Sequence, residues 1–338
     1  MPQGLPDLVS QFKFLWPHLE LFNVGAIDLD DAQQLKQANR SIRPFFVRTT
    51  KNELGLEKPT IRYRSVEMGP KQKEAWTLLK DESARFIAGL NPNDKAELRT
   101  IGKQIMRVLQ FCSDPQLLLK QLPASYRGGE LFNRLKGLSN DDSSKVKLLD
   151  KLVAQTMAKP GEKVVIWSMF VDQIERLKDR YAEYGAISIH GGVPTGSDED
   201  LAFREARIAR FKKNTDCRIL VANPAACGEG ISLHRAAHHA IYFDRSFNAA
   251  HFLQSIDRIH RRGLPAGTKT HIDIICLEDS IEVAVRTRLS QKIERLQKML
   301  DDDDLSAMVY DPEDVESIGE DWMVESSDIN SVMKVLRS

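Results

Sequence analysis

The sequence predicts an α/β protein with one doubly wound parallel sheet, preceded by a mainly helical segment. From residue 163 onward, short apolar runs alternate with windows of helical periodicity. Such alternation is typical of parallel strands that helices cover on both faces. Before residue 143, long helical windows dominate instead. A chain of 338 residues is long enough for two compact domains, or for one domain with helical additions.

Five strands are predicted because short runs of branched and aromatic residues lie between turn residues. We expect these strands at residues 163–168, 186–190, 217–222, 239–244 and 270–277. Helices are expected between them at 171–184, 200–213 and 249–261. A long amphipathic helix at 281–300 is expected to close the unit.

The front of the chain reads as helices joined by polar linkers. Helical windows cover residues 70–90 and 93–110, with one extended piece at 60–67. The run Asp142-Ser143-Ser144 can cap a helix that runs from Lys145 to about Met157. These patterns divide the chain into residues 1–60, 61–142, 143–300 and 301–338.

Charge is distributed unevenly along the chain. Residues 301–338 hold 12 Asp or Glu against Lys334 and Arg337, although the whole chain has a formal net charge of zero. We therefore expect an acidic, disordered C-terminal tail attached to a basic body. A basic body is compatible with a polyanionic partner such as nucleic acid.

Several classes of protein are excluded by what the sequence lacks. The four cysteines form no C-x-x-C pair, and no carboxylate or cysteine stands at ligand spacing beside the His234, His238 and His239 group. We therefore expect no zinc or other metal site, and reduced, mostly buried thiols. No apolar run is long enough to span a membrane, and the first residues do not resemble a secretory signal, so a cytoplasmic location without membrane attachment is expected.

The most informative motif is the run at residues 254–263, Gln-Ser-Ile-Asp-Arg-Ile-His-Arg-Arg-Gly. In it, Gln254, Asp257, Arg258 and Arg261 recur at spacings of three and four, which places them on one face of the predicted helix. Two guanidinium groups, an amide and a carboxylate just past a strand suit the recognition of a polyphosphate.

A second motif is the glycine-containing turn after the third predicted strand. Gly228, Glu229 and Gly230 lie among small residues, where the backbone can approach a ligand closely. Amides in such a turn can face an anion. The tight packing of a loop onto a sheet is the commoner use of this pattern, so the motif gains weight only from its place beside the arginine helix.

Together, these motifs resemble the second RecA-like lobe of the Swi/Snf-family helicase-like ATPases. The resemblance rests on the motifs at 163–170, 190–192, 228–233, 242–244 with Asn248, and 254–263, and extends back to 42–51 and 105–118. It implies a RecA-like fold. By this resemblance, residues 1–60 are the end of a first helicase lobe, 61–142 a helical linker or insertion, 143–300 the C-terminal lobe, and 301–338 an acidic tail.

The resemblance also implies roles for the motif residues. In this family ATP with Mg²⁺ lies between two lobes, and the second lobe supplies arginines that stabilise the charge developing during phosphoryl transfer. Arg261 is then the leading arginine finger, Arg258 its companion, and Asp257 the residue that holds their geometry. Further residues implied on the nucleotide side are Gln254, Gly228, Glu229 and Gly230.

Contacts with the DNA backbone are implied at the ends of other strands. The corresponding positions are Ser168, His190, Gly191 and Asn223, and their contacts would be directed at phosphates of duplex DNA, independent of base sequence. Without the resemblance, a hydroxyl that caps the next helix is the more frequent use of Ser168. This chain departs from the family with Asn223 in place of Ser or Thr, Phe247 in place of Trp, and Leu264-Pro265 in place of Gln.

The sequence lacks the motifs of a first lobe. It contains neither G-x-x-x-x-G-K-[ST] nor a D-E-x-[HD] run, so the phosphate loop and the carboxylates that hold Mg²⁺ must come from elsewhere. Residues 1–9 resemble the sequence just after the family's Gly-Thr-Pro motif, as expected of a fragment, a split-gene product or a shortened subunit. We expect half of a DNA translocase or helicase that needs a first-lobe chain or segment to hydrolyse ATP. The alternatives are a non-catalytic nucleic-acid-binding or regulatory module and an RNA helicase lobe.

Overall fold

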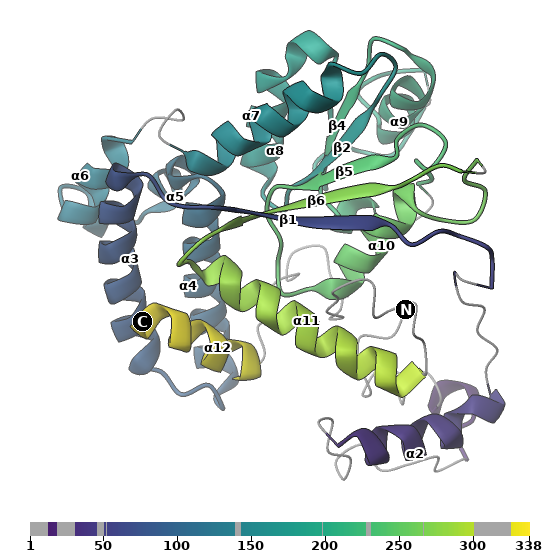
Figure 1. The fold of residues 1–338 in the computed structure, drawn as a ribbon. Helices are drawn as coiled ribbons and strands as arrows, with labels where there is room; N and C mark the ends of the chain where they lie inside the picture. The colour runs from purple at the N-terminus through teal and green to yellow at the C-terminus, as the bar shows by residue number, and fades with distance from the viewer. Residues whose placement is uncertain are drawn as a thin grey trace.

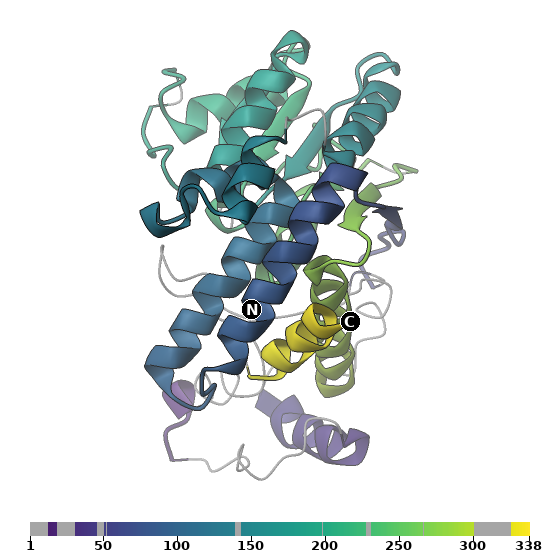
Figure 2. The ribbon, with the colours of Figure 1, turned by 90° about the vertical axis from the view of Figure 1, so that its left-hand side faces the viewer.

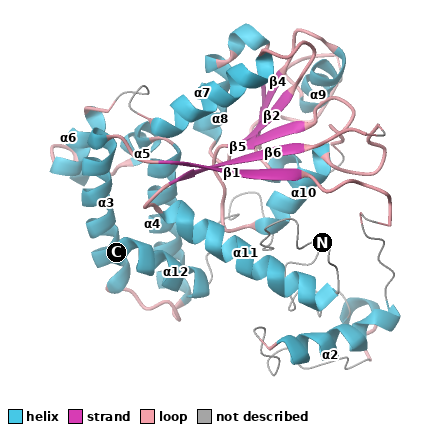
Figure 3. Cartoon of the chain, in the orientation of Figure 1, coloured by secondary structure: helices cyan, strands magenta, loops and turns pink. Residues whose placement is uncertain are grey.

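The computed structural model describes residues 13–18, 31–45, 51, 53–138, 143–197, 199–227, 231–265, 267–300 and 326–338. Six strands form one sheet in the order β1-β6-β5-β2-β4-β3, and every neighbouring pair is parallel. Helices flank the sheet, as Figures 1 and 3 show. The α/β class with a doubly wound parallel sheet is thus confirmed.

The five strands expected from the sequence are all present. They are β2 (Val164–Trp167), β3 (Ile187–Ile189), β4 (Ile219–Ala222), β5 (His239–Tyr242) and β6 (His271–Leu277). Every residue of β2 and β4 is buried. Strands covered on both faces need apolar side chains on both, which explains why their sequences are nearly continuous apolar runs.

A sixth strand, β1 (Thr60–Val66), corrects the expected grouping of the chain. The sequence placed this extended piece at the start of the helical linker. In the structure it pairs in parallel with β6, with Thr60 opposite His271 and Val66 opposite Leu277. It forms one edge of the sheet, so the sheet begins upstream of the helical segment.

Two layers of helices cover the sheet. On one face α7 (Ser144–Met157) and α8 (Val171–Arg180) pack through side chains such as Leu149 and Ile174. On the other face α9 (Arg204–Lys213), α10 (Ala249–Ile259) and α11 (Ile281–Leu300) contribute residues to a second core. A cap was expected from residues 142–144, and the structure shows that Ser143 provides it, since its hydroxyl accepts the amide of Val146 at 3.4 Å.

The helical segment between β1 and α7 forms its own layer. It comprises α3 (Pro70–Ala88), α4 (Lys95–Ser113), α5 (Pro115–Gln121) and α6 (Glu130–Lys136). Carboxylates of Asp94 and Asp114 cap α4 and α5 by accepting backbone amides. Figure 2 shows α3 and α4 side by side. Their apolar faces join the start of α11 and the segments after β2 and β5 in a third core.

The C-terminal end of the chain is folded, contrary to the expectation of a disordered tail. Residues Ser326–Arg337 form α12, which packs on α3 and α11 through Ile329, Val332 and Leu336. Asp328 is fully buried and accepts hydrogen bonds from Arg288 Nε at 2.6 Å and Lys292 Nζ at 3.1 Å. Residues 301–325 lie outside the described part of the chain.

The remaining elements are short. They are α2 (Ala32–Ile42) and the 3₁₀ turns Arg43–Phe45, Ala124–Tyr126, Ala182–Tyr184 and Ala225–Cys227. Among the helices that the structure describes, none has the length and apolar character needed to cross a membrane.

Candidate nucleotide and DNA-backbone site

The carboxyl ends of the strands bring the predicted DNA-contacting positions to one edge of the sheet. Ser168 follows β2, His190 follows β3 and Asn223 follows β4. Backbone bonds continue the ladder past these strands, because Ser168 donates its amide to Ala222 and Asn223 donates its amide to Ile189. The edge where parallel strands end is the usual ligand-binding edge of such sheets. We call it the carboxyl edge.

Asp244, which follows β5, is the central acceptor of the carboxyl edge. Its Oδ2 accepts the hydroxyls of Ser113 and Ser168, each at 2.7 Å, and its Oδ1 accepts the amide of Met169 at 2.6 Å. Burial raises the pKa of Asp244, while the positive charge of Lys145 and these hydrogen bonds oppose that rise. The carboxyl group thus ties α4 and the ends of β2 and β5 together.

Ser168 is placed at the expected edge but faces inward. Its residue has no exposed surface, and its hydroxyl is donated to Asp244. In this arrangement the hydroxyl supports the turn and does not reach solvent. A direct phosphate contact by Ser168 therefore stays a prediction that its observed position does not support.

Half-buried His190 and exposed Gly191 form a turn after β3. Both ring nitrogens of His190 are engaged: Nε2 lies 3.1 Å from Glu175 Oε1, and Nδ1 accepts the amide of Gly192 at 3.1 Å. Partial burial raises the pKa of Glu175, but hydrogen bonds with Lys178, Ser188 and His190 outweigh burial and hold it at about 2. Gly191 is exposed, so its backbone can approach a phosphate.

Asn223 uses its side chain to join two turns. Its Nδ2 donates to the carbonyl of Met169 at 3.0 Å, and its Oδ1 accepts the amide of Ala225 at 2.8 Å. The family's Ser or Thr has a shorter side chain at this position. Asn223 therefore spans the ends of β2 and β4 while remaining partly exposed.

The two motif arginines converge on one segment, although they do not share a helix. Helix α10 ends at Ile259, so Arg258 lies on the helix and Arg261 lies beyond it, which corrects the expected single helix face. Arg258 Nη1 donates to the carbonyl of Ile231 at 3.2 Å, and Arg261 Nη1 donates to Ser232 Oγ at 2.8 Å. The chain turns after them at Gly263, whose φ of +97° favours glycine.

The structure describes only some of the residues expected on the nucleotide side. Asp257 forms an ion pair with Lys51, which belongs to the front segment that resembles the family. Gln254 is half-buried on α10. Gly228, Glu229 and Gly230 lie outside the described residues, but Arg258 and Arg261 bind the residues that follow them directly.

Two arginines that the sequence analysis missed also shape the carboxyl edge. Arg245 is buried after β5, with its guanidinium carbon 5.8 Å from the ring centre of Tyr63 and 5.7 Å from that of Phe252. Arg204 on α9 donates to the carbonyls of Ala226 and Val193, at 3.1 and 3.3 Å, and so links the loops after β4 and β3. A charged residue directly after a buried strand was the available signal for Arg245.

No cluster of three His, Cys, Asp or Glu side chains with the geometry to hold a metal ion occurs in the described ranges. The four cysteines are free thiols and all are buried, as expected. Burial raises the pKa of Cys276 to about 11, so this thiol stays protonated near neutral pH.

His260, between the motif arginines, predicts a pH dependence of stability. Burial, with the charge of Lys51 nearby, lowers its pKa to about 4. The unfolded chain therefore binds a proton at His260 more tightly than the folded chain does. The contribution of neutral His260 to the unfolding free energy is complete above pH ~6.5 and is lost as the pH falls toward 4. The unfolding free energy of the native chain should fall as the pH drops from ~6.5 to 4. In His260→Asn this fall should be smaller by on the order of 1 to 3 kcal/mol.

Urea unfolding between pH 4.5 and 7 would measure this effect. Since other histidines also titrate, the informative quantity is the difference between the native chain and the variant. His18, which is exposed, provides the matched control. A His260→Asn variant with the same pH profile as the native chain would contradict the prediction.

A parallel six-stranded sheet with helices packed on both faces has the architecture of a RecA-like lobe. Residues 144–263 match the helicase conserved C-terminal domain. Over 273 residues the chain is 26% identical to Protein CHROMATIN REMODELING 4 of Arabidopsis thaliana, covering 78% of this chain and 12% of that protein. The chain thus spans a small part of the length of this relative.

Solved structures share the fold. The C-terminal part of the Fun30 ATPase domain superposes with a TM-score of 0.54 at 20% identity, covering 83% of this chain and 97% of that one. The Sulfolobus solfataricus SWI2/SNF2 ATPase core in complex with dsDNA gives a TM-score of 0.53 at 18% identity, covering 96% of this chain and 63% of that one. Residues 144–263 of this chain thus match the helicase conserved C-terminal domain, and the chain shares its fold with solved SWI2/SNF2-type ATPase structures.

Proposed function

We propose that this chain is the second-lobe half of an ATP-dependent translocase that moves along duplex DNA. The observation that carries the proposal is the convergence of Arg258 and Arg261 on the segment 231–232, directly after the glycine-containing turn. A similar core, from Sulfolobus solfataricus, is described in complex with double-stranded DNA. The first lobe would come from another chain or from a preceding segment.

The exposed position of Arg261 fits a nucleotide that another lobe presents. A guanidinium has five N–H donors, and one hydrogen bond to Ser232 orients the group without using all of them. ATP with Mg²⁺, held by the first lobe, would supply the phosphoryl group. Arg261 would then stabilise the charge on the transferred group, and Arg258 would hold the turn against α10.

The carboxyl edge supports the second part of the proposal, which is sequence-independent contact with the DNA backbone. Asn223 and the turn at His190 and exposed Gly191 lie after neighbouring strands, where amides and polar side chains can bind successive phosphates. Asp244, Arg204 and Asn223 hold these loops in fixed positions. Contacts of this kind read the backbone and carry no base preference.

We predict that a polypeptide of this sequence alone does not hydrolyse ATP in the presence of DNA. The motif arginines stabilise a transition state that requires the phosphate loop and Mg²⁺ of a first lobe, and neither first-lobe motif occurs in this sequence. Steady-state phosphate release by the purified chain, with and without duplex DNA, measures this. Turnover by the chain alone that Arg261→Ala abolishes would refute the division into two lobes.

Adding a first lobe from the same family distinguishes the three functional hypotheses. DNA-stimulated turnover in the mixture supports the translocase. Stable DNA binding without restored turnover supports a non-catalytic binding module. Stronger stimulation by duplex RNA than by duplex DNA supports an RNA helicase lobe.

A further inference from the structure

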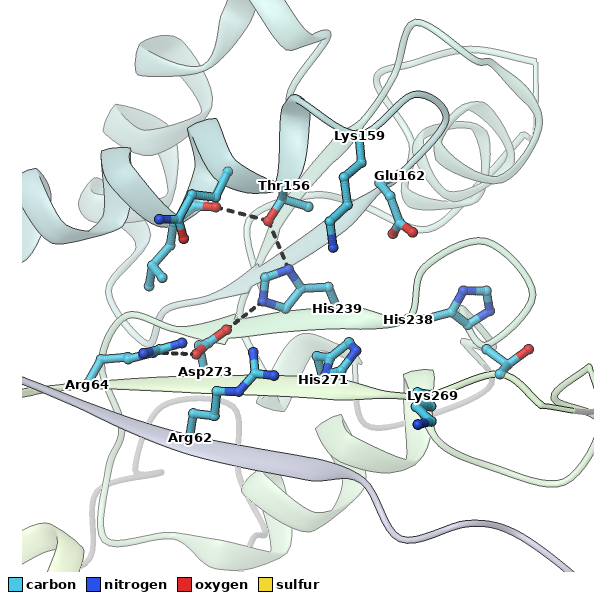
Figure 4. A pocket seen from close by; sticks show the side chains of 13 residues that line it. Arg62, Arg64, Thr156, Lys159, Glu162, His238, His239, Lys269, His271 and Asp273 are labelled. Atoms are coloured by element: carbon cyan, nitrogen blue, oxygen red, sulfur yellow. Dashed lines mark hydrogen bonds and ion pairs between the residues drawn. The ribbon is translucent and has the colours of Figure 1, made fainter.

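A cavity of about 410 Å³ opens at the amino ends of β1, β5 and β6, away from the carboxyl edge (Figure 4). His239 and His271, the first residues of β5 and β6, line it together with the chain between α7 and β2. We call it the basic cavity. Its lining residues are Arg62, Arg64, Leu152, Gln155, Thr156, Lys159, Glu162, His238, His239, Thr268, Lys269, His271 and Asp273.

The lining carries a surplus of positive charge. Four arginines and lysines face two carboxylates. Asp273, one of the two, is already bound by Arg64 Nε at 2.7 Å and by His239 Nε2 at 2.8 Å. Within the described part of the chain, three further cations of the lining form no ion pair: Arg62, Lys159 and Lys269. Figure 4 shows Lys159 entering from the side opposite Arg62.

These polar residues occupy positions that a buried sheet normally fills with apolar side chains. Arg62, Asp273 and Ile241 stand opposite one another across β1, β6 and β5, and so point to the same face. Helix α7 covers that face, where the core contains Ile241 beside Asp273 and, nearer the carboxyl edge, Ile275. The apolar pattern of the covered face thus stops at the basic cavity. Departures from the expected burial of apolar residues are common at functional sites.

His239 and His271 differ in how far their hydrogen bonds are satisfied. His239 Nδ1 lies 2.9 Å from Thr156 Oγ1, and its other nitrogen binds Asp273, so both are engaged. Nδ1 of His271 is buried and has no hydrogen-bond partner among the described residues. Burial lowers the pKa of His271, as do the charges of Arg62, His239 and Lys159, while Asp273 opposes them. The negative charge of a bound anion would oppose these effects and raise the pKa of His271.

We propose that the basic cavity binds a small, multiply charged anion that carries phosphate groups. Its volume lies in the range of sites for small molecules, ~300 to 1,000 Å³. Guanidinium and ammonium groups entering from several sides match phosphate oxygens, which accept hydrogen bonds in several directions. A concave site of this size does not suit the extended backbone of a duplex. The cavity lies at the end of the sheet opposite the carboxyl edge, and neither Arg258 nor Arg261 lines it.

The test measures binding of inorganic tripolyphosphate to the full chain by calorimetry at ~0.15 M salt. We expect the double variant Arg62→Glu/Lys159→Glu to weaken binding by at least ~10-fold, since it reverses two charges that face the anion. Both residues are exposed, so the fold should be retained, and circular dichroism verifies this. Lys147→Glu, on an exposed position of α7 outside the cavity, is the matched control.

Further arms locate the anion. Binding that persists in Arg258→Ala/Arg261→Ala supports the basic cavity and is independent of the proposed translocase function. The imidazole signals of His271, followed by NMR, should show a higher pKa when tripolyphosphate is bound. Undetectable binding of tripolyphosphate to the native chain would overturn the proposal. So would equal weakening of binding by Lys147→Glu and by Arg62→Glu/Lys159→Glu, or a loss of binding that occurs only in Arg258→Ala/Arg261→Ala.

Discussion

Replacing Arg261 with alanine is expected to lower ATP turnover by ~10³- to 10⁵-fold once the chain is combined with a first lobe. Arg261 lies beyond α10, exposed, with its guanidinium oriented by Ser232. A permanently charged group in this position acts mainly on the transition state, so the turnover number should fall far more than the affinity for ATP. Single-turnover and steady-state hydrolysis would measure both quantities.

The neighbouring Arg262 offers a matched control for this prediction. It is also exposed and carries the same charge, but it stands outside the motif spacing that the resemblance assigns to the nucleotide. Arg262→Ala should leave turnover within a few-fold of the native value. Equal losses in the two variants would mean that net charge, and not an arginine finger, accounts for the effect.

Replacing Lys145 with methionine is expected to destabilise the lobe by ~3 to 5 kcal/mol. The side chain of Lys145 is completely buried and lies 2.5 Å from Glu282, which has only 7% of its side chain exposed. Its ammonium group also sits 4.8 Å from the ring centre of Phe243. Methionine fills a similar volume, so the loss comes chiefly from leaving the Glu282 carboxylate buried without its cation.

The pH dependence of this loss separates charge from packing. Burial raises the pKa of Glu282, and Lys145 opposes that rise, so the variant should raise it further. A carboxyl group with a raised folded pKa contributes stability below its unfolded pKa and loses it as the pH rises through the folded value. The deficit of Lys145→Met, measured by urea unfolding, should therefore grow from pH 5 to pH 8.

Two further variants complete this comparison. Lys145→Met/Glu282→Gln should recover much of the lost stability, because glutamine can still accept the amide of Leu277 without a charge. Lys147→Met, on an exposed position of the same helix, should stay within ~0.5 kcal/mol of the native chain. A loss that does not vary with pH, and that the double variant does not relieve, would contradict the buried-charge explanation.

The sequence predicts most of the lobe because its local signals agree with its burial. The strands β2 and β4 are uninterrupted apolar runs, and α11 occupies the residues 281–300 that its periodicity indicated. By contrast, the pairing of β1 with β6 joins residues far apart in the chain. Its mixed burial pattern, typical of an edge, gives no indication of the partner strand.

Helix α12 was not predicted, because the expectation of a disordered tail rested on the net charge of residues 301–338 and not on their helical periodicity. Ile329, Val332 and Leu336 recur at spacings of three and four, which is a readable helical signal within the acidic end. What could not be read was the burial of Asp328 against Arg288 and Lys292, since it depends on the position of α11. A charged residue can thus belong to a core when its partners arrive from another element.

For the candidate site, residue types were easier to predict than the direction of their side chains. The motif spacing placed Arg258 and Arg261 together, and the structure brings both to residues 231–232. Whether Ser168 faced solvent depended on Asp244, which follows another strand, β5, and accepts its hydroxyl. Sequence spacing describes one element, while the orientation of a side chain is fixed by its neighbours.

The edge position of β1 has a consequence for synthesis of the chain. Arg64 and its partner Asp273 are separated by 209 residues, so at ~5 to 20 residues per second β1 leaves the ribosome roughly 10 to 40 s before β6. During that interval its backbone donors and acceptors have no sheet to join. Arg62 and Arg64 place positive charges within β1, and charges there discourage pairing with a foreign strand. We therefore expect Arg62 and Arg64, which line the basic cavity in the folded lobe, also to limit aggregation of the nascent polypeptide.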